Sequence, residues 1–218
     1  MQRTVYILLG PPGSGKGTQA KRVAPCLKVP HISLGDLLRE AVAKKTEIGL
    51  KIESFLKAGK LAPDEIVIKV AEDRIKQDDC REGVVVDGFP RTIAQAKAFE
   101  KILNKAGFNQ GKVIYIDLPL EGIVQRLGGR RSCKKCGAVY HAEFSPPKAE
   151  GKCDKCGEEL YLRHDDEKSV IETRFRVYDE QTKPLVDHYE KQGILMHIDG
   201  KQKIDNVFES ICAKLKVA

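Results

Sequence analysis

The sequence predicts an α/β fold in which a doubly wound, parallel sheet of five strands carries helices on both faces. Two observations favour this class. Strand-sized apolar runs rich in β-branched residues recur along the chain, and longer stretches with apolar residues at helical spacing separate them. Strands that alternate with helices in this way are typical of parallel sheets, because a parallel crossover needs a connection of helical length.

Five segments carry the strand signal. The first, at residues 4–9, is a continuous apolar run that ends in glycine, as expected of a strand buried on both faces. The other four lie at residues 29–33, 83–86, 112–118 and 194–199. Helical spacing is found between and after them, at residues 18–27, 64–77, 92–106, 120–127, 168–192 and 204–215.

Two regions break this alternation. Residues 35–59 have a helical pattern but bring no new strand, and residues 133–162 are rich in Gly, Pro, Lys and Cys without a sustained period. We therefore expect two insertions in one core. The core would comprise residues 1–32, 63–128 and 165–218, with a small helical insertion at 33–62 and a second insertion at 129–164.

Composition limits the class of protein. The 218 residues are 41% hydrophobic and 32% charged, which indicates a globular chain with a sizeable core and excludes a disordered or fibrous one. The apolar runs are too short for a membrane span, and the first one leads into a glycine-rich turn rather than a signal-peptide cleavage site, so we expect a cytoplasmic protein. The net charge of +7 suggests an anionic partner: a nucleotide, a nucleic acid or a lipid surface.

A glycine-rich segment, GPPGSGK at residues 10–16, joins the first predicted strand to the first predicted helix. In that context the GxxxxGK pattern predicts a phosphate-binding loop, since backbone N–H groups and the helix N-terminus face the anion while Lys16 reaches the β- and γ-phosphates. The alternative, an ordinary glycine turn, does not explain the lysine. The usual Ser/Thr after the lysine is replaced by Gly17. The predicted loop residues are Gly10, Gly13, Ser14, Gly15, Lys16, Gly17 and Thr18.

Four cysteines predict a metal site. Two CxxC pairs, Cys133/Cys136 and Cys153/Cys156, are separated by 16 residues, which is the spacing of a tetrahedral zinc site built from two knuckles. Two disulfides, or four buried thiols, are the alternatives. A glycine follows each pair, where a knuckle must turn. Four thiolate ligands would leave no open position, so the predicted zinc is structural and stabilises a small lid.

Several motifs together identify a family resemblance. GPPGSGKGTQAKR, ISLGDLLR, DGFPRT, GRR at 129–131 and RHDDEKSVIETR follow one another between residues 10 and 174. In this order they resemble adenylate kinases of the long bacterial type with a zinc-binding lid. The resemblance implies a monomeric enzyme that transfers the γ-phosphoryl of Mg²⁺-bound ATP reversibly to AMP, giving two ADP, with no nucleic-acid or membrane partner. It also implies that the insertion at 33–62 binds the nucleoside monophosphate and that lid closure excludes water.

The resemblance assigns roles to charged residues, and phosphoryl transfer explains why arginines suit them, since catalysis is mostly positioning and charge stabilisation. The implied catalytic residues are Lys16, Asp87, Arg91, Arg130, Arg163 and Arg174. Asp87 ends a predicted strand, where it could hold hydrated Mg²⁺ in place of the missing hydroxyl at position 17, or simply cap a turn. Asp165 and Asp166 are interpreted as hinge or anchoring acids.

The two nucleotides would occupy separate sets of residues. ATP would bind the phosphate loop, Arg126 and Arg130, with Arg126 stacking on adenine and His141 or Phe144 on its other face. Leu34 stands where the family commonly has threonine, so one polar contact to AMP is expected to be missing. The implied AMP-binding residues are Ser33, Arg39, Gly88, Arg91, Gln95, Arg163 and Arg174.

Two other functions are compatible with these motifs. One is a kinase for another nucleoside monophosphate or donor, such as UMP or GTP. The other is a nucleic-acid-dependent ATPase that uses the cysteine region as a zinc ribbon. The second is disfavoured because residues 130–165 contain eight Lys or Arg and six Asp or Glu, a net charge of +2, without a concentrated basic stripe.

Overall fold

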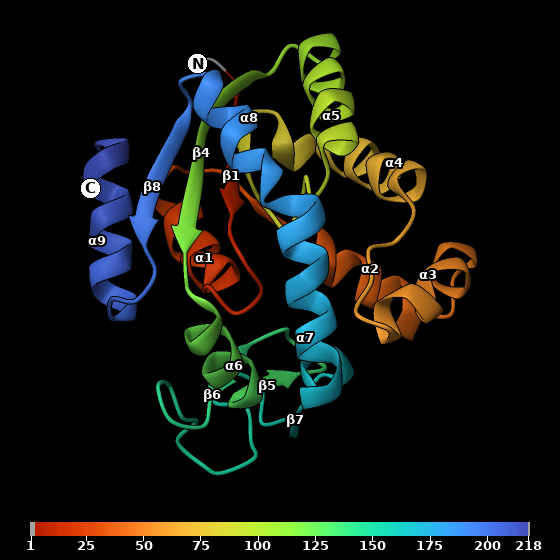
Figure 1. Cartoon of the computed structure of the whole chain (residues 1–218), viewed down its shortest axis with the longest axis vertical. Helices are drawn as coiled ribbons and strands as arrows, with labels where there is room; N and C mark the ends of the chain where they lie inside the picture. The colour runs from red at the N-terminus through yellow and green to blue at the C-terminus, as the bar shows by residue number, and fades with distance from the viewer. Residues whose placement is uncertain (1–2, 218) are drawn as a thin grey trace.

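A computed structural model describes residues 3–217 and shows a five-stranded parallel sheet (Figure 1). The order of its strands is β2-β3-β1-β4-β8, and every neighbouring pair is parallel. This confirms the fold class and all five predicted strands. Their bounds are β1 Thr4–Leu9, β2 His31–Ser33, β3 Gly83–Asp87, β4 Asn109–Asp117 and β8 Leu195–Asp199.

Helices cover both faces of this sheet because alternate side chains of a strand point to opposite faces. In β1, Val5 and Ile7 enter one apolar core and Leu8 enters the other. The second core is closed by α1 (Lys16–Cys26) and α9 (Ile204–Leu215). The first core is closed by α4 (Asp64–Ile75), α5 (Ile93–Lys105) and α8 (Pro184–Lys191), which lie on the other side of the strands in Figure 1.

The region between β2 and α4 is helical, as its pattern predicts. It contains α2 (Leu34–Ala43) and α3 (Glu47–Lys57), which pack closely against each other. A Cβ on Gly49 would lie only 2.1 Å from the carbonyl oxygen of Ala41, so this crossing requires glycine. The pair extends away from the sheet at the right of Figure 1.

The insertion at residues 129–164, hereafter the cysteine region, folds beyond α6 (Leu120–Gly128). It lies at the end of the molecule toward which β4 and β8 point (Figure 1). It contains a small antiparallel sheet of order β6-β5-β7, formed by β5 (Arg130–Cys133), β6 (Val139–His141) and β7 (Leu160–Tyr161). Sequence analysis did not predict these strands, because segments of two to four residues are too short to show a period.

The long helical stretch at 168–192 is not one uniform helix, which corrects the predicted element. It consists of α7 (Lys168–Val177), a π-helical turn at Tyr178–Thr182, and α8. Pro184 has no backbone N–H and disfavours an uninterrupted α-helix. The N–H of Lys183 instead donates to the carbonyl of Tyr178, five residues earlier, at 2.9 Å.

Two 3₁₀ turns, Asp78–Cys80 and His164–Asp166, complete the regular structure. None of the helices within residues 3–217 combines the length and the apolar character that a membrane-spanning segment needs.

Candidate active site and metal centre

The phosphate loop connects the C-terminal end of β1 to the N-terminus of α1, as predicted. Gly10, Gly13 and Gly15 all have positive φ angles, of 147°, 78° and 94°. At Gly10 a Cβ would lie 2.3 Å from the carbonyl oxygen of Ile116, so a larger residue would displace the loop from the sheet. Lys16 folds back over this loop and donates from Nζ to the carbonyl of Pro11 at 2.8 Å.

The surroundings of Lys16 disfavour its own charge. Burial lowers the pKa of Lys16 to about 7, and three nearby arginines, Arg91, Arg174 and Arg130, act in the same direction while Asp87 opposes them. A ligand that brings negative charge would stabilise the charged form of Lys16, since phosphate oxygens interact favourably with an ammonium group.

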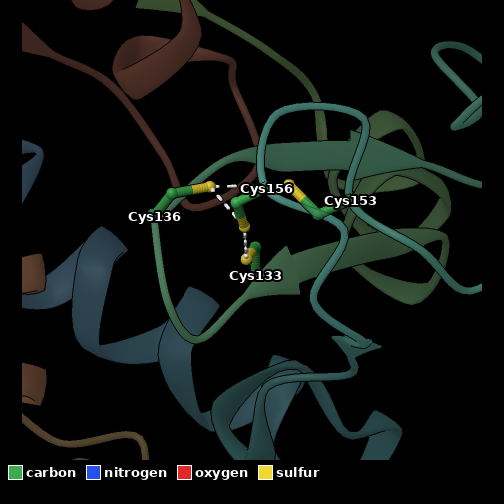
Figure 2. A group of neighbouring side chains, drawn as sticks. All are labelled: Cys133, Cys136, Cys153 and Cys156. Atoms are coloured by element: carbon green, nitrogen blue, oxygen red, sulfur yellow. Dashed lines mark hydrogen bonds between the residues drawn. The ribbon is translucent and has the colours of Figure 1, made fainter.

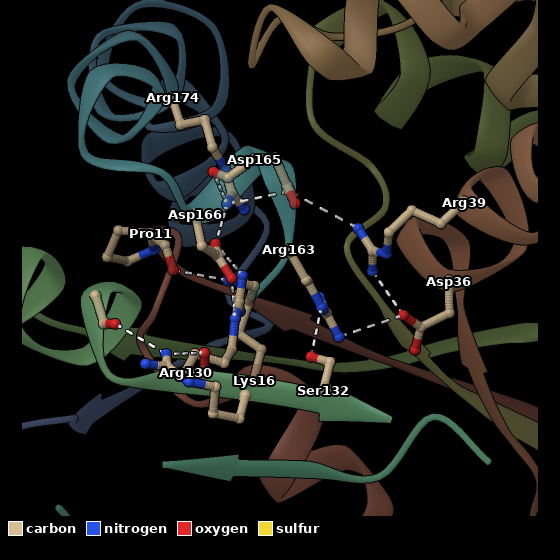
Figure 3. Close-up of polar contacts among 12 residues, drawn as sticks. Pro11, Lys16, Asp36, Arg39, Arg130, Ser132, Arg163, Asp165, Asp166 and Arg174 are labelled. Atoms are coloured by element: carbon tan, nitrogen blue, oxygen red, sulfur yellow. Dashed lines mark hydrogen bonds and ion pairs between the residues drawn. The ribbon is translucent and has the colours of Figure 1, made fainter. Parts of the chain in front are cut away.

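Five arginines from distant parts of the chain converge near this lysine: Arg39, Arg91, Arg130, Arg163 and Arg174, hereafter the arginine cluster. Figure 3 shows four of them with Lys16, approaching from α2, from the cysteine region and from α7. Burial and neighbouring guanidinium groups lower the pKa of Arg91 and of Arg163 to about 10. Concentrated, buried positive charge is costly unless it serves an anion.

Carboxylates occupy the arginine forks in this structure. Asp166, whose side chain is fully buried, accepts from Nε of Arg130 at 2.6 Å and from Nη1 of Arg174 at 2.6 Å. Asp165 pairs with Arg174 at 3.1 Å, and Asp36 with Arg39 at 2.6 Å. Asp165 and Asp166 do more than anchor a hinge, because they hold guanidinium groups in place. Their position inside the RHDDEKSVIETR motif was the available signal.

Asp87 ends β3 and faces the start of α1. A Cβ on Gly17 would lie 3.1 Å from Oδ2 of Asp87, so the carboxylate fills the space beside the position where many phosphate loops carry a hydroxyl. The structure thus explains the glycine at position 17 by the close approach of an acid from the neighbouring strand. Nε2 of His31, on β2, lies 3.9 Å from the same oxygen.

Arg91 is held by a turn after β3 that depends on glycine. Gly88 has a φ of 75°, and its carbonyl accepts from Nε of Arg91 at 2.8 Å. Ser33 caps α2 by accepting from the N–H of Asp36 at 3.3 Å. Leu34, at the start of α2, is buried in the apolar core.

Gln95 is buried at the start of α5, and both ends of its side chain bond to the protein. Oε1 accepts from the backbone N–H of Arg91 at 2.8 Å, and Nε2 donates to Asp64 at 2.7 Å. The hydroxyl of Thr92 donates to the other oxygen of Asp64 at 2.9 Å. Asp64 lies at the start of α4, about 30 positions before this loop, and through these bonds it fixes the loop that carries Arg91. The sequence motifs did not identify it.

Arg126 lies on α6 beside the phosphate loop. Its Nη2 donates to the carbonyl of Gly200 at 2.7 Å, and burial lowers the pKa of its guanidinium. His141 and Phe144 stack on each other with ring centroids 4.4 Å apart. The His141 ring also contacts the carbonyl of Gln125, so the aromatic pair lies next to the helix that carries Arg126.

A cavity of about 80 Å³ lies between the two sides of the site. Lys16 from the phosphate loop, Arg91 from the turn after β3 and Arg174 from α7 all line it. It is located at the C-terminal ends of the parallel strands, where open α/β sheets bind ligands.

The four cysteines also come together (Figure 2). Their sulfur atoms all lie within 4.8 Å of one another. Cys156 contacts two others, Cys133 at 3.4 Å and Cys136 at 3.5 Å, and Cys136 also contacts Cys153 at 3.5 Å. Shared contacts of this kind fit one tetrahedral ion, which would hold sulfurs about 3.8 Å apart, better than two separate disulfides.

The backbone of both knuckles supports the same interpretation. Gly137 and Gly157 have φ angles of 65° and 73°, as the turn after each CxxC pair requires. Tyr140 adds a hydroxyl contact to the sulfur of Cys153 at 3.6 Å. The donor set fits Zn²⁺. Of the other cysteines, Cys80 is buried, whereas Cys26 and Cys212 are only partly buried.

Comparison with known proteins agrees with this geometry. The family model described as adenylate kinase matches residues 8–194. The chain belongs to the adenylate kinase family. An adenylate kinase of Archaeoglobus fulgidus is 50% identical over 210 residues, which are 96% of this chain and 97% of that protein. Those of Agathobacter rectalis (50% over 205 residues; 94% and 96%) and Clostridioides difficile (49% over 209; 96% and 97%) are similarly related.

Membership in the adenylate kinase family confirms the resemblance drawn from the motifs and makes the chain a nucleoside monophosphate kinase, a phosphotransferase. Adenylate kinases bind ATP, AMP and ADP and use Mg²⁺ with ATP.

The cysteine cluster yields a direct prediction. The purified protein should contain about one zinc per chain, and replacing Cys153 and Cys156 by serine should remove it, because two thiolates cannot close the site. The melting temperature should fall by several degrees, the scale of losing a few kcal/mol in a chain of this size. Elemental analysis and calorimetry measure both. Cys212→Ser is the matched control and should retain zinc; equal zinc content in both variants would contradict the assignment.

Proposed function

We propose that the chain transfers the γ-phosphoryl of ATP reversibly to AMP, giving two ADP. The observation that carries the proposal is the convergence of Lys16, Arg91 and Arg174 on one cavity between the phosphate loop and the turn at Gly88, with the other arginines of the cluster close to them. Phosphoryl transfer needs two nucleotides placed end to end and donors around the transferring group. The arrangement of cations supports both requirements.

The donor role falls to the phosphate loop, Gly10 to Thr18. Its N–H groups and Lys16 would hold the β- and γ-phosphates. Arg126, next to the His141–Phe144 pair, would line the adenine site. Bound phosphates would replace the carbonyl of Pro11, 2.8 Å from Nζ, as the partner of Lys16. Lys16 then carries its charge where negative charge shifts during transfer, which stabilises the transition state more than the ground state.

The acceptor role falls to Ser33, Arg39, Gly88, Arg91 and Gln95. Arg39 and Arg91 would bind the α-phosphate of AMP through their planar forks, and Gln95 would orient the loop of Arg91 and contact the base with its remaining N–H. Arg130, Arg163 and Arg174 would shift from their carboxylate partners to the transferring phosphoryl. Asp165 and Asp166 serve as positioning residues for these arginines.

Two metals complete the proposal. Asp87 would hold hydrated Mg²⁺ through its waters, and that ion supplies charge neutralisation between the phosphates. Zn²⁺ bound by Cys133, Cys136, Cys153 and Cys156 would have no open position and would act structurally.

We further propose that residues 33–62 form the acceptor-binding insertion and residues 129–164 the lid, each attached to the core comprising 1–32, 63–128 and 165–218. Two contacts support closure over the site: Nη2 of Arg163, in the lid, lies 3.7 Å from Asp36 in the insertion, and Nη1 of Arg39, in the insertion, lies 4.0 Å from Asp165, the first core residue after the lid. Closure would exclude water and prevent hydrolysis of the γ-phosphoryl. We expect the enzyme to act as a monomer in the cytoplasm.

A substrate panel tests the reaction. Purified protein with Mg²⁺ should transfer phosphate from ATP to AMP much faster than to UMP, CMP or GMP, and faster from ATP than from GTP. Chromatography of the nucleotides measures each rate. A preference for UMP as acceptor or for GTP as donor would contradict the proposal and indicate the related kinase. ATP hydrolysis that requires an oligonucleotide and does not depend on AMP would indicate the nucleic-acid-dependent ATPase.

The acceptor assignment is tested separately. Arg91→Ala should raise the KM for AMP about 10- to 100-fold, since a hydrogen bond to a charged group contributes about 1.5–3 kcal/mol, while the KM for ATP changes far less. Steady-state kinetics with each nucleotide varied in turn measures both. Arg131→Ala is the matched control, because that guanidinium donates only to the carbonyls of Gly128 and Arg130 among its described partners. Equal effects on AMP and ATP in Arg91→Ala would refute the assignment.

A further inference from the structure

One side chain of the phosphate-loop helix contacts the cysteine region directly. Lys21, on α1, donates from Nζ to the carbonyl oxygen of Gly137 at 2.8 Å, across 116 positions of sequence. Lys21 lies five residues after Lys16, so the contact joins the helix that begins at the phosphate loop to the first knuckle, defined as residues 133–138. Nothing in the motif analysis singled out Lys21.

The accepting carbonyl is held by the fold of the first knuckle. The N–H of Gly137 donates to the carbonyl of Cys133 at 3.1 Å, and the N–H of Cys133 donates to the carbonyl of Ala138 at 2.9 Å. The positive φ of Gly137, 65°, sets the direction of the turn. The position of this carbonyl therefore depends on the same turn that brings Cys136 toward the other sulfurs.

Charge adds to this contact. Four thiolates around one Zn²⁺ would carry a net charge of −2. Gly137 directly follows Cys136, so the ammonium of Lys21 would lie beside this anionic centre. High salt should weaken the attraction because Lys21 is exposed.

The contact is distinct from the others that close the site. Arg163 approaches Asp36 and thereby joins the cysteine region to the helical insertion, on the acceptor side. Lys21 instead joins the cysteine region to α1, the core helix that begins at the phosphate loop. Lys21 also lines a cavity with Ser33 and Asp36, so its charge reaches the acceptor side as well. The effect of the contact itself is therefore measured on ATP against a variant that keeps the charge.

We propose that Lys21 is a positioning residue that docks the metal-bound lid on the phosphate-loop helix, so that zinc and ATP each favour binding of the other. The proposal rests on the proposed function for its donor site. Linkage requires reciprocity: if zinc strengthens ATP binding through this contact, ATP must strengthen zinc binding by the same factor.

The first experiment compares Lys21→Met with Lys21→Arg, which keeps a cationic donor. Lys21→Met should raise the KM for ATP about threefold at low salt without reducing kcat, because the chemistry is untouched. Lys21→Arg should stay near the wild type, and the difference should shrink at high salt. An unchanged KM for ATP in Lys21→Met, or a fall in kcat alone, would overturn the proposal.

The second experiment does not depend on catalysis. The zinc dissociation constant, measured by competition with a chelator, should fall when a non-hydrolysable ATP analogue is added to the wild type. In Lys21→Met that effect should be about threefold smaller, matching the change in affinity for the analogue, while Lys28→Met, which alters a lysine just beyond α1, should behave like the wild type. Equal linkage in Lys21→Met and the wild type would refute the role of Lys21.

These outcomes also separate this inference from the proposed reaction. A chain that binds the analogue with Lys21-dependent zinc linkage but transfers no phosphate to AMP would refute the reaction alone. If the chain transfers phosphate to AMP but the linkage between zinc and the analogue does not depend on Lys21, the inference alone is refuted.

Discussion

The concentration of positive charge around Lys16 is the constraint on which the rest of the site depends. One lysine and five arginines held this close would repel one another and lose hydration on burial, so the fold must supply counter-charges or receive them from a ligand. Asp165, Asp166 and Asp36 supply part of that charge, and burial, together with three nearby arginines, lowers the pKa of Lys16 to about 7. An anionic ligand such as phosphate would supply further counter-charge.

The fold meets this constraint by bringing together segments that are far apart in sequence. The parallel sheet places the phosphate loop and the turn after β3 at one edge, because both follow strands that end on the same side. The arginines of the cysteine region and of α7 come from outside the sheet. They reach the site only when those segments lie over it. The stability of the small sheet in the cysteine region is therefore linked to the electrostatics of the cavity.

Much of this could be predicted from sequence. The strands of the central sheet, the phosphate loop and the cysteine cluster each have local signals: a continuous apolar run, fixed glycine positions and a fixed spacing of thiols. What could not be predicted depends on tertiary contacts. The strands β5, β6 and β7 are too short to show a period. The π-helical turn before Pro184 depends on that single proline. The hydrogen bond from Gln95 to Asp64 spans 31 positions of sequence. Lys21 lies within the first motif, but the motif does not reveal its partner, which is a backbone carbonyl 116 positions away.

The central claim is that the protein alone does not keep Lys16 fully charged and that bound phosphates restore the proton on this side chain. In the ligand-free protein the pKa of Lys16 is about 7, so at pH 8 most molecules lack this proton. Phosphate oxygens should raise that pKa above 8, so binding should take up close to one proton, and affinity should fall as pH rises above 7. Titration calorimetry at pH 8 with a non-hydrolysable ATP analogue, in buffers of different ionisation enthalpy, counts the protons. The account predicts an uptake in the wild type that is absent in Lys16→Met; the same proton count in both proteins would contradict it.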